Sequence, residues 1–185
     1  MKILVTGGGG FLGSSICRQL AAAGHEVSAF QRRPATHLAS AGVTSIQGDI
    51  RNESALDKAV EGVDAVIHCA ARAGIWGRAE DYQWVNVGGT GNVIESCRTH
   101  GVSSLVYTSS PSVVLTGEDI EGGDESLPVV TDPLTAYQAS KIEAEDMVLE
   151  ANTRGLRTVV LRPHLMWGPG DPHLLPRLIE RAEKD

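Results

Sequence analysis

The feature that most constrains the fold is a glycine cluster near the N-terminus, Thr6-Gly7-Gly8-Gly9-Gly10-Phe11-Leu12-Gly13. A short apolar run, Ile3-Leu4-Val5, precedes the cluster, and a helical pattern of apolar residues follows it as far as Gly24. Strand, glycine turn and helix in this order predict a dinucleotide site. The glycines permit a tight turn, close approach of a pyrophosphate and packing of helix on strand. The helix then presents free N–H groups to the phosphates.

Length and composition are typical of one globular domain. The chain has 185 residues, of which 42% are hydrophobic and 21% charged. The formal net charge of -7 argues against nucleic-acid binding, which needs a basic surface. No apolar run is long enough to span a membrane, and the first strand follows Met1-Lys2 at once. We therefore expect no signal peptide and a cytoplasmic protein.

The cysteines, Cys17, Cys69 and Cys97, are interpreted as small buried hydrophobes in a reducing compartment. Their number is odd, and no CxxC pair or Cys/His cluster accompanies them. We expect neither a metal site nor a disulfide.

Strands and helices alternate along the rest of the chain. Further strands are predicted at residues 26–31, 44–47, 64–68, 103–108 and 157–162. Helices are predicted at residues 52–62, 81–100, 134–154 and 173–185. The alternation predicts an α/β fold, a Rossmann-type doubly wound parallel sheet with helices on both faces, as one domain over residues 1–185.

The end of the second strand bears on cofactor choice. In a dinucleotide fold an acidic residue there binds the ribose 2′-OH of NAD, whereas an arginine accommodates the 2′-phosphate of NADP. This chain has Gln31 and Arg32 in that place and no carboxylate. Charge complementarity predicts a preference for NADP(H), with NAD(H) possible. The alternative is that Arg32 and Arg33 are solvated surface residues.

Three other features have simpler interpretations. His68 is a strand residue among packed neighbours, because no partner carboxylate or metal spacing surrounds it. Residues 72–78 form a flexible segment in which Trp76 either covers a substrate or fills space in the packing. Residues 114–133 carry a run of acids and are predicted to form an exposed excursion with solvated charges.

A tyrosine and a lysine suggest the chemistry. Tyr137 and Lys141 lie four residues apart on one predicted helix, so their side chains share a face. Ser109 and Ser110 follow a strand, at the same edge of the sheet as the glycine turn. The lysine ammonium and an oxidised nicotinamide would favour the phenolate form of Tyr137. Tyr137 could then take a proton from an alcohol or give one to a ketone, while a serine hydroxyl bonds the substrate oxygen. The set predicts hydride transfer; a tyrosine–lysine pair alone is a common surface pattern.

Seven motifs occur in the order seen in the extended short-chain dehydrogenases/reductases of the NAD-dependent epimerase/dehydratase superfamily, which the whole chain resembles. They are Thr6–Gly13, Gly48-Asp49-Ile50, Cys69-Ala70-Ala71, Asn86–Thr90, Tyr107–Ser110, Tyr137–Lys141 and Leu161-Arg162-Pro163. Residues 107–113 and 167–176 are most similar to the branch of 3β-hydroxysteroid dehydrogenases and 2-alkyl-3-oxoalkanoate reductases.

The resemblance implies a role for each matching residue. The phosphate turn would comprise Gly7, Gly10, Phe11, Leu12 and Gly13. Asp49 and Ile50 would contact adenine, Ala70 and Ala71 would line the nicotinamide side, and Pro163 and His164 would open the loop beside the nicotinamide. The catalytic residues would be Ser110, Tyr137 and Lys141. Lys141 would hold the nicotinamide ribose, and Ser109 and Tyr137 would also contact the cofactor. Asn86 would be a structural helix residue near the site.

The chain departs from the family pattern in two places. Gln31 and Arg32 replace the acidic residue typical of NAD-dependent members. The family also continues well beyond this length, so we expect the C-terminal substrate-binding part to be largely absent. A homodimer built from the helices at 81–100 and 134–154 is expected from the family.

Three hypotheses follow. The first is an NAD(P)-dependent oxidoreductase acting on a 3-oxo or 3-hydroxy group of a small apolar substrate, such as a β-keto acid or a sterol-like ketone. The second is a nucleotide-sugar epimerase or dehydratase that retains its NAD. The third is a non-catalytic cofactor-binding fragment.

Overall fold

The computed structural model describes residues 1–74, 76–172 and 174–184. Six parallel strands form one sheet in the order β3-β2-β1-β4-β5-β6. Their bounds are β1 Lys2–Thr6, β2 Glu26–Gln31, β3 Thr44–Gln47, β4 Ala65–His68, β5 Ser104–Thr108 and β6 Arg157–Leu161. The order reverses between β1 and β4, where α/β sheets bind ligands beyond the carboxyl ends of their strands. The predicted doubly wound fold is confirmed.

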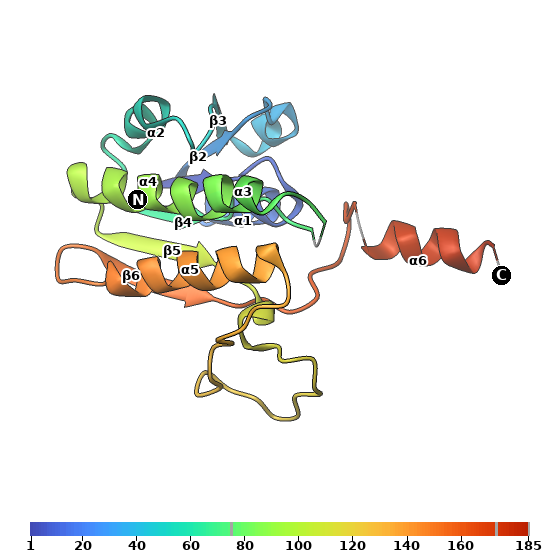
Figure 1. Ribbon diagram of the computed structural model, residues 1–185. Helices are drawn as coiled ribbons and strands as arrows, with labels where there is room; N and C mark the ends of the chain where they lie inside the picture. The colour runs from blue at the N-terminus through green and yellow to red at the C-terminus, as the bar shows by residue number, and fades with distance from the viewer. Residues whose placement is uncertain (75, 173, 185) are drawn as a thin grey trace.

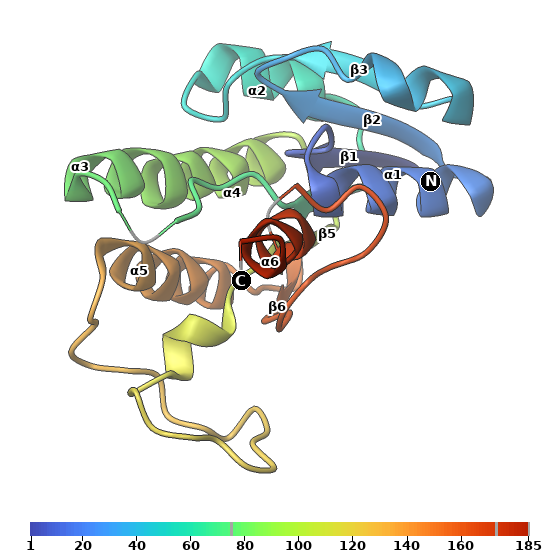
Figure 2. The same ribbon diagram turned by 90° about the vertical axis from the view of Figure 1, so that its right-hand side faces the viewer.

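Helices pack on both faces of this sheet (Figure 1, Figure 2). The α-helices are α1 Phe11–Ala22, α2 Glu53–Val60, α3 Ala79–Tyr82, α4 Gly89–Thr99, α5 Ala136–Glu150 and α6 Leu174–Ala182. The 3-10 helices are η1 Thr36–Ala41 and η3 Pro111–Val114, and η2 Gln83–Gly88 is a π-helix. One face carries α2, α4 and α5, and the other carries α1 and η1, whereas α6 stands apart from the sheet with no buried residue.

Each face of the sheet has its own hydrophobic core, and β1 supplies both. Leu4 packs with residues of α2, α4 and α5, such as Leu56 and Val93. Its neighbours Ile3 and Val5 point the other way and pack with α1 and η1. Because both faces are covered, the strand is apolar at successive positions rather than alternating.

The predicted helix at 81–100 is interrupted, which the sequence pattern did not indicate. It consists of α3, the π-helix η2 and α4 in succession. A side chain at Gly89 would come within about 2.5 Å of the Ile50 side chain, so the glycine lets this helix approach the loop after β3. π-Helical turns occur frequently at functional sites, and this one contains Asn86.

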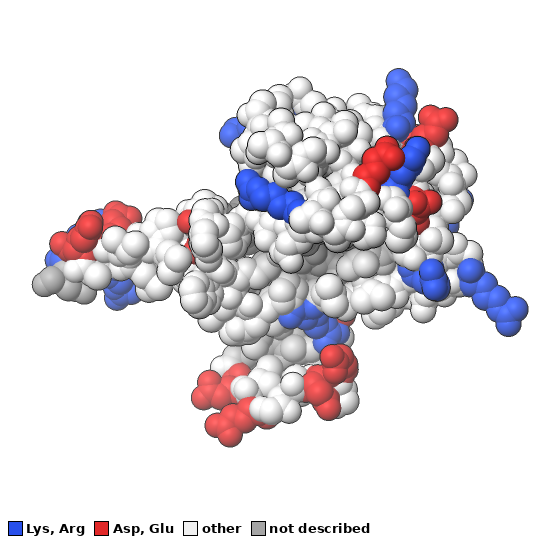
Figure 3. Space-filling view, turned by 180° about the vertical axis from the view of Figure 1, so that it is seen from behind, with Lys and Arg blue, Asp and Glu red and all other residues white. Residues whose placement is uncertain are grey.

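The acidic excursion is exposed, as predicted. Residues 116–126 are all exposed, and Figure 3 shows acidic side chains gathered on the protruding excursion. The last predicted helix is present as α6, although its expected end residues, His173 and Asp185, lie outside the described residues, as does Ile75. In the part of the chain that the structure describes, no helix is long and apolar enough to cross a membrane.

Candidate active site

The glycine turn between β1 and α1 forms a cradle that side chains would fill. Gly7 has a φ of 70°, and a Cβ atom there would lie 2.8 Å from the backbone nitrogen of Ala70. A side chain at Gly13 would overlap the backbone of Gly7, and one at Gly8 would lie 2.6 Å from the Cβ of Ala29. Gly10 is the N-cap of α1 and has no side-chain cap. The turn therefore leaves bare N–H groups at the start of α1.

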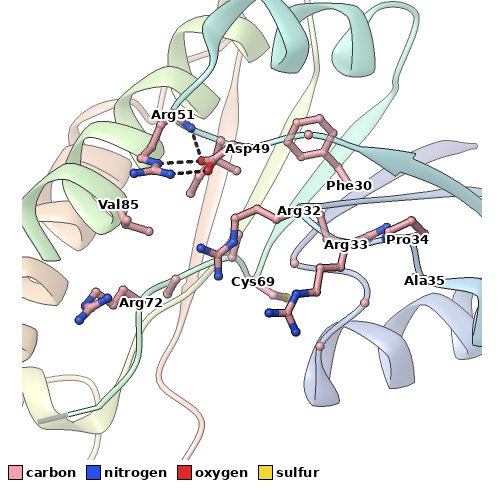
Figure 4. A pocket seen from close by; sticks show the side chains of 18 residues that line it. Phe30, Arg32, Arg33, Pro34, Ala35, Asp49, Arg51, Cys69, Arg72 and Val85 are labelled. Carbon is pink, nitrogen blue, oxygen red and sulfur yellow. Dashed lines mark hydrogen bonds and ion pairs between the residues drawn. The ribbon is translucent and has the colours of Figure 1, made fainter. Parts of the chain in front are cut away.

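A pocket of about 540 Å³ lies between this turn and the ends of β2, β3 and β4 (Figure 4). Its lining includes the expected cofactor residues Gly7, Gly10, Gln31, Arg32, Asp49, Ile50, Ala70 and Ala71. It also includes Arg33, Arg51 and Arg72, which the sequence pattern did not assign to the site. The side chains of Arg32 and Arg33 extend into the pocket (Figure 4). The sequence held a signal for two of them. Arg33 directly follows Arg32, and Arg51 directly follows the expected adenine contacts Asp49 and Ile50.

The carboxylate of Asp49 is held by Arg51. Its Oδ1 accepts from the Arg51 backbone N–H and from Nε, both at 3.0 Å, and its Oδ2 accepts from a terminal nitrogen at 2.7 Å. These bonds lower the pKa of Asp49. The Arg51 guanidinium also lies 4.9 Å from the ring centre of Trp84. Asp49 is thus an ionised acceptor in a fixed orientation at the pocket wall.

These residues fit a dinucleotide. The glycine cradle leaves space where a backbone must approach a pyrophosphate, and Arg32 and Arg33 suit phosphate groups. The Gln31 side chain donates to Ser45 at 2.9 Å, but its Oε1 is buried without a partner in the described structure. An unpaired acceptor beside the pocket suits a hydroxyl donor such as a ribose.

A second pocket, of about 850 Å³, adjoins the first at the glycine turn. Phe11 and Leu12 line it, together with residues of the loop at 165–172, including Trp167. Pro163 and His164 lead into this loop but are absent from the described linings of both pockets. The loop therefore faces the start of α1.

Ser110 and Tyr137 come together beyond the end of β5. Ser110 is the N-cap of η3, where its Oγ accepts from the backbone N–H of Ser112 at 3.2 Å. Burial raises the pKa of Tyr137, and a side-chain hydrogen bond with Ser110 acts in the opposite direction. The ring of Tyr82, from α3, meets Tyr137 edge-on at 6.2 Å. The phenol is therefore neutral at pH 7 and bonded to the serine.

Tyr82 also holds the loop that follows β4. Its hydroxyl donates to the carbonyls of Gly74 at 2.8 Å and Trp76 at 2.9 Å. The Trp76 side chain is 86% exposed, so the interpretation as packing filler is wrong. A cover over the substrate stays a prediction.

The ammonium of Lys141 contacts the end of β5 rather than the side chain of Tyr137. Its Nζ donates to the Tyr107 hydroxyl and to the Thr108 carbonyl, both at 2.7 Å. The side chain is 2% exposed, and burial lowers its pKa to about 7, opposed by the charge of Glu145. Among the hydrogen bonds of the described residues, none joins Lys141 to Tyr137. The lysine is thus held at the end of β5.

Ser109 is engaged by a residue that the sequence pattern did not single out. Its hydroxyl donates to the carboxylate of Glu145, which also accepts from the guanidinium of Arg162. The available signals were the spacing of Glu145, four residues after Lys141, and the arginine in the Leu161-Arg162-Pro163 motif. The two serines therefore differ in role: Ser109 is tied to α5, and Ser110 faces Tyr137.

His68 is packed, as predicted. It is fully buried between Thr6, at 2.6 Å from Nδ1, and Thr90, at 3.0 Å from Nε2. Burial lowers its pKa to about 3, so the imidazole is neutral. Nearby, the Asn86 amide donates to the Arg72 carbonyl and to Ser140, and accepts from the Arg72 N–H. Asn86 thereby joins η2 to the loop after β4 and to α5.

Two of the cysteines are small core residues, as predicted, and the third lies at the pocket wall. Cys17 and Cys97 are buried, which raises their pKa values to about 11 and about 12. Cys69 is half-buried in the pocket wall and accepts from the Thr108 hydroxyl at 3.3 Å. Over the described ranges, no group of three or more metal-ligating side chains comes together.

Comparison with known proteins places these features in a family. Residues 4–185 match the 3-beta hydroxysteroid dehydrogenase/isomerase family. The chain is 51% identical to a 2-alkyl-3-oxoalkanoate reductase of Stenotrophomonas maltophilia, over all of this chain and 56% of the relative. It is 39% identical to a 3-beta-hydroxysteroid dehydrogenase of Mycolicibacterium neoaurum, over 98% of this chain and 52% of the relative. The chain therefore spans about half the length of these curated relatives.

A solved structure shares the fold closely. UDP-glucuronic acid 4-epimerase from Bacillus cereus, in complex with UDP-glucuronic acid and NAD, superposes with a TM-score of 0.86 at 28% identity. The match covers 100% of this chain and 63% of that chain. All of this chain therefore has a counterpart in that structure.

Proposed function

The chain belongs to the 3-beta hydroxysteroid dehydrogenase/isomerase family, and we propose that it is the nucleotide-binding and catalytic part of an NAD(P)-dependent oxidoreductase. The reaction is hydride transfer between the nicotinamide and a 3-oxo or 3-hydroxy group of a small apolar substrate. The observation that carries the proposal is that Ser110 lies beside Tyr137 and that Lys141 bonds the end of β5, where Thr108 also bonds Cys69 of the pocket wall. The names of the two relatives support the substrate class.

Each catalytic residue has a defined task in this proposal. The bound nicotinamide supplies or accepts the hydride. Tyr137, neutral at pH 7, gives its proton to a ketone oxygen during reduction, and in the reverse direction its phenolate takes the proton of the alcohol. Ser110 donates a hydrogen bond to the same oxygen as negative charge develops there. Lys141 binds the nicotinamide ribose from the end of β5.

Replacing Tyr137 tests the reaction. Tyr137→Phe removes the proton donor and keeps the ring, so kcat/KM for reduction of a 2-alkyl-3-oxoalkanoate should fall by about 10²–10⁴-fold. NADPH affinity, measured by calorimetry, should stay within about twofold because the pocket residues are unchanged. Equal turnover by the variant would refute the assigned role. If the unmodified chain also binds the cofactor but turns over no ketone, the non-catalytic alternative is favoured.

The same site is compatible with a nucleotide-sugar epimerase that retains NAD. The likeness to the epimerase of Bacillus cereus favours this second candidate. Copurified NAD, together with conversion of a UDP-sugar, would support it over the leading proposal.

We further propose that the cofactor is NADP(H), since Arg32 and Arg33 extend into the pocket without a carboxylate at the end of β2. Arg32→Ser should weaken NADPH binding at least about tenfold, the effect of losing one charge-assisted hydrogen bond, and change NADH binding little. Arg98→Ser, on the far end of α4, is the matched control. Equal affinity of the unmodified chain for NADH and NADPH would exclude the preference, and tighter binding of NADH would make NAD(H) the cofactor.

A homodimer is also proposed. Exposed apolar side chains on the two helical segments expected to form it, Trp84 on η2 and Leu149 on α5, support this arrangement.

A further inference from the structure

Helix α5 carries a third polar residue in line with the half-buried Tyr137 and the buried Lys141. Glu145 follows Lys141 by four residues, as Lys141 follows Tyr137, so the three side chains share one face of the helix. The exposed fractions of Lys141 and Glu145 are 2% and 3%. Charged side chains are almost never buried to this degree unless they are paired. The two charges therefore require an explanation.

The partners of Glu145 come from the ends of two neighbouring strands. Ser109, which follows β5, donates its hydroxyl to Oε2. Arg162, which follows β6, donates from Nε to Oε1 at 3.1 Å and to Oε2 at 3.3 Å, and its terminal nitrogen also contacts Oε1. The backbone N–H of Ser109 bonds the Leu161 carbonyl at 2.7 Å, so both partners belong to one rigid corner. One carboxylate thus fixes this corner to α5.

The Lys141 ammonium is bound at the same corner. It donates to the carbonyl of Thr108, the residue before Ser109. The titratable groups that face it are His68, Cys69, Tyr107 and Glu145, with Tyr137 beyond Tyr107 and Arg162 behind Glu145. Burial keeps the imidazole, the thiol and both phenols neutral at pH 7. The charges that remain are those of Lys141, Glu145 and Arg162.

We propose that Glu145 is a positioning residue, whose buried carboxylate keeps the Lys141 ammonium protonated and holds the Ser109 corner in place, while Arg162 pairs with that carboxylate. The inference rests on the proposed function only in that Lys141 binds the nicotinamide ribose. Burial lowers the pKa of Lys141 to about 7, and the charge of Glu145 opposes this shift. Without the carboxylate, the pKa of Lys141 falls below neutral pH. At pH 7 the side chain is then a neutral amine, which can no longer donate three hydrogen bonds.

Glu145→Gln separates charge from shape. The amide keeps the size of the side chain, and its oxygen and nitrogen can still bond Arg162 and Ser109. Glu150→Gln, at the exposed C-terminal end of α5, is the matched control. The readout is the pKa of Lys141, measured by an NMR pH titration of the lysine side chains in the chain without ligand. The Lys141 signal is identified by its loss in Lys141→Met. We expect the pKa of Lys141 to fall by about one pH unit or more in Glu145→Gln and to stay unchanged in Glu150→Gln.

An unchanged Lys141 titration in folded Glu145→Gln overturns the proposal. If that variant does not fold, Glu145→Leu combined with Arg162→Met replaces the buried pair by apolar side chains of similar volume, and the same fall is expected. A second readout is the pH profile of kcat/KM, whose alkaline limb should move to lower pH in Glu145→Gln. If the titration moves and no variant turns over a ketone, the inference stands and the proposed function fails. If the chain turns over a ketone and the titration does not move, the inference fails and the proposed function stands.

Discussion

Single residues hold the site together through polar atoms buried from solvent, and His68 is the example with the sharpest consequence. The Thr90 hydroxyl donates to the Asn86 carbonyl at 2.5 Å, so Thr90 Oγ1 is left to accept from the imidazole Nε2. The Thr6 hydroxyl then donates to Nδ1. Both ring nitrogens are satisfied in the neutral Nε2–H tautomer, and burial disfavours the imidazolium.

This arrangement predicts a stability that depends on pH. The pKa of His68 is lowered to about 3 in the folded chain, against 6.5 for an ordinary histidine. Below pH 6.5 the unfolded chain therefore binds a proton that the folded chain does not, and stability falls as the pH drops. Between pH 6.5 and 5, the free energy of unfolding should fall by about 2 kcal/mol more in the unmodified chain than in His68→Gln. Urea titrations at the two pH values measure the difference, and equal falls in both proteins would contradict it.

At the scale of elements, the site depends on how the excursion between β5 and α5 is closed. Gln138, on the first turn of α5, donates to the carbonyls of Ser112 at 2.7 Å and Leu115 at 3.0 Å. Its carbonyl accepts from the Leu134 N–H at 2.7 Å. One buried amide therefore bonds both ends of an exposed segment, next to the turn that bears Ser110.

Gln138→Met should open this closure while filling the same volume. Three backbone groups lose their partner, but those of the exposed Leu115 and Leu134 can bond water instead, so we expect a loss of about 1–3 kcal/mol in stability, the cost of one unpaired group. Limited proteolysis should cut residues 116–126 faster than in the unmodified chain. The control Gln19→Met, on the exposed face of α1, should change stability by less than about 0.5 kcal/mol. Equal proteolysis of both variants would show that the amide does not hold the excursion.

At the scale of the whole molecule, helices cover both faces of the sheet, and the pocket lies where the strand order reverses. The side of the sheet with α4 and α5 also carries the exposed apolar residues of the proposed dimer contact. We expect sedimentation equilibrium to give the mass of two chains. Leu149→Glu should shift the chain toward the monomer because it buries a charge in that contact, whereas Leu178→Glu on α6 should not. A monomer at all micromolar concentrations would contradict the proposed dimer.

Much of the fold followed from local pattern. The strands at 26–31 and 44–47 match their predicted bounds, and in the first the apolar residues of the run are the buried ones. The helix at 81–100 was predicted as one α-helix, since a π-helical turn leaves no distinct apolar period. The short η3 helix was missed because it depends on the Ser110 cap and on contacts that the chain makes only after α5 packs.

The sequence by itself determined the order of the elements, the glycine turn and the residue types available for chemistry, because these depend on neighbours along the chain. The tertiary structure alone decided which buried charges face one another. Lys141 was expected beside Tyr137 on spacing along one helix, but its ammonium bonds the end of β5. Glu145 and Arg162 lie 17 residues apart and meet only when β6 joins the sheet. A charge removed from water takes its partner from whatever the packing brings near, and that information is not local.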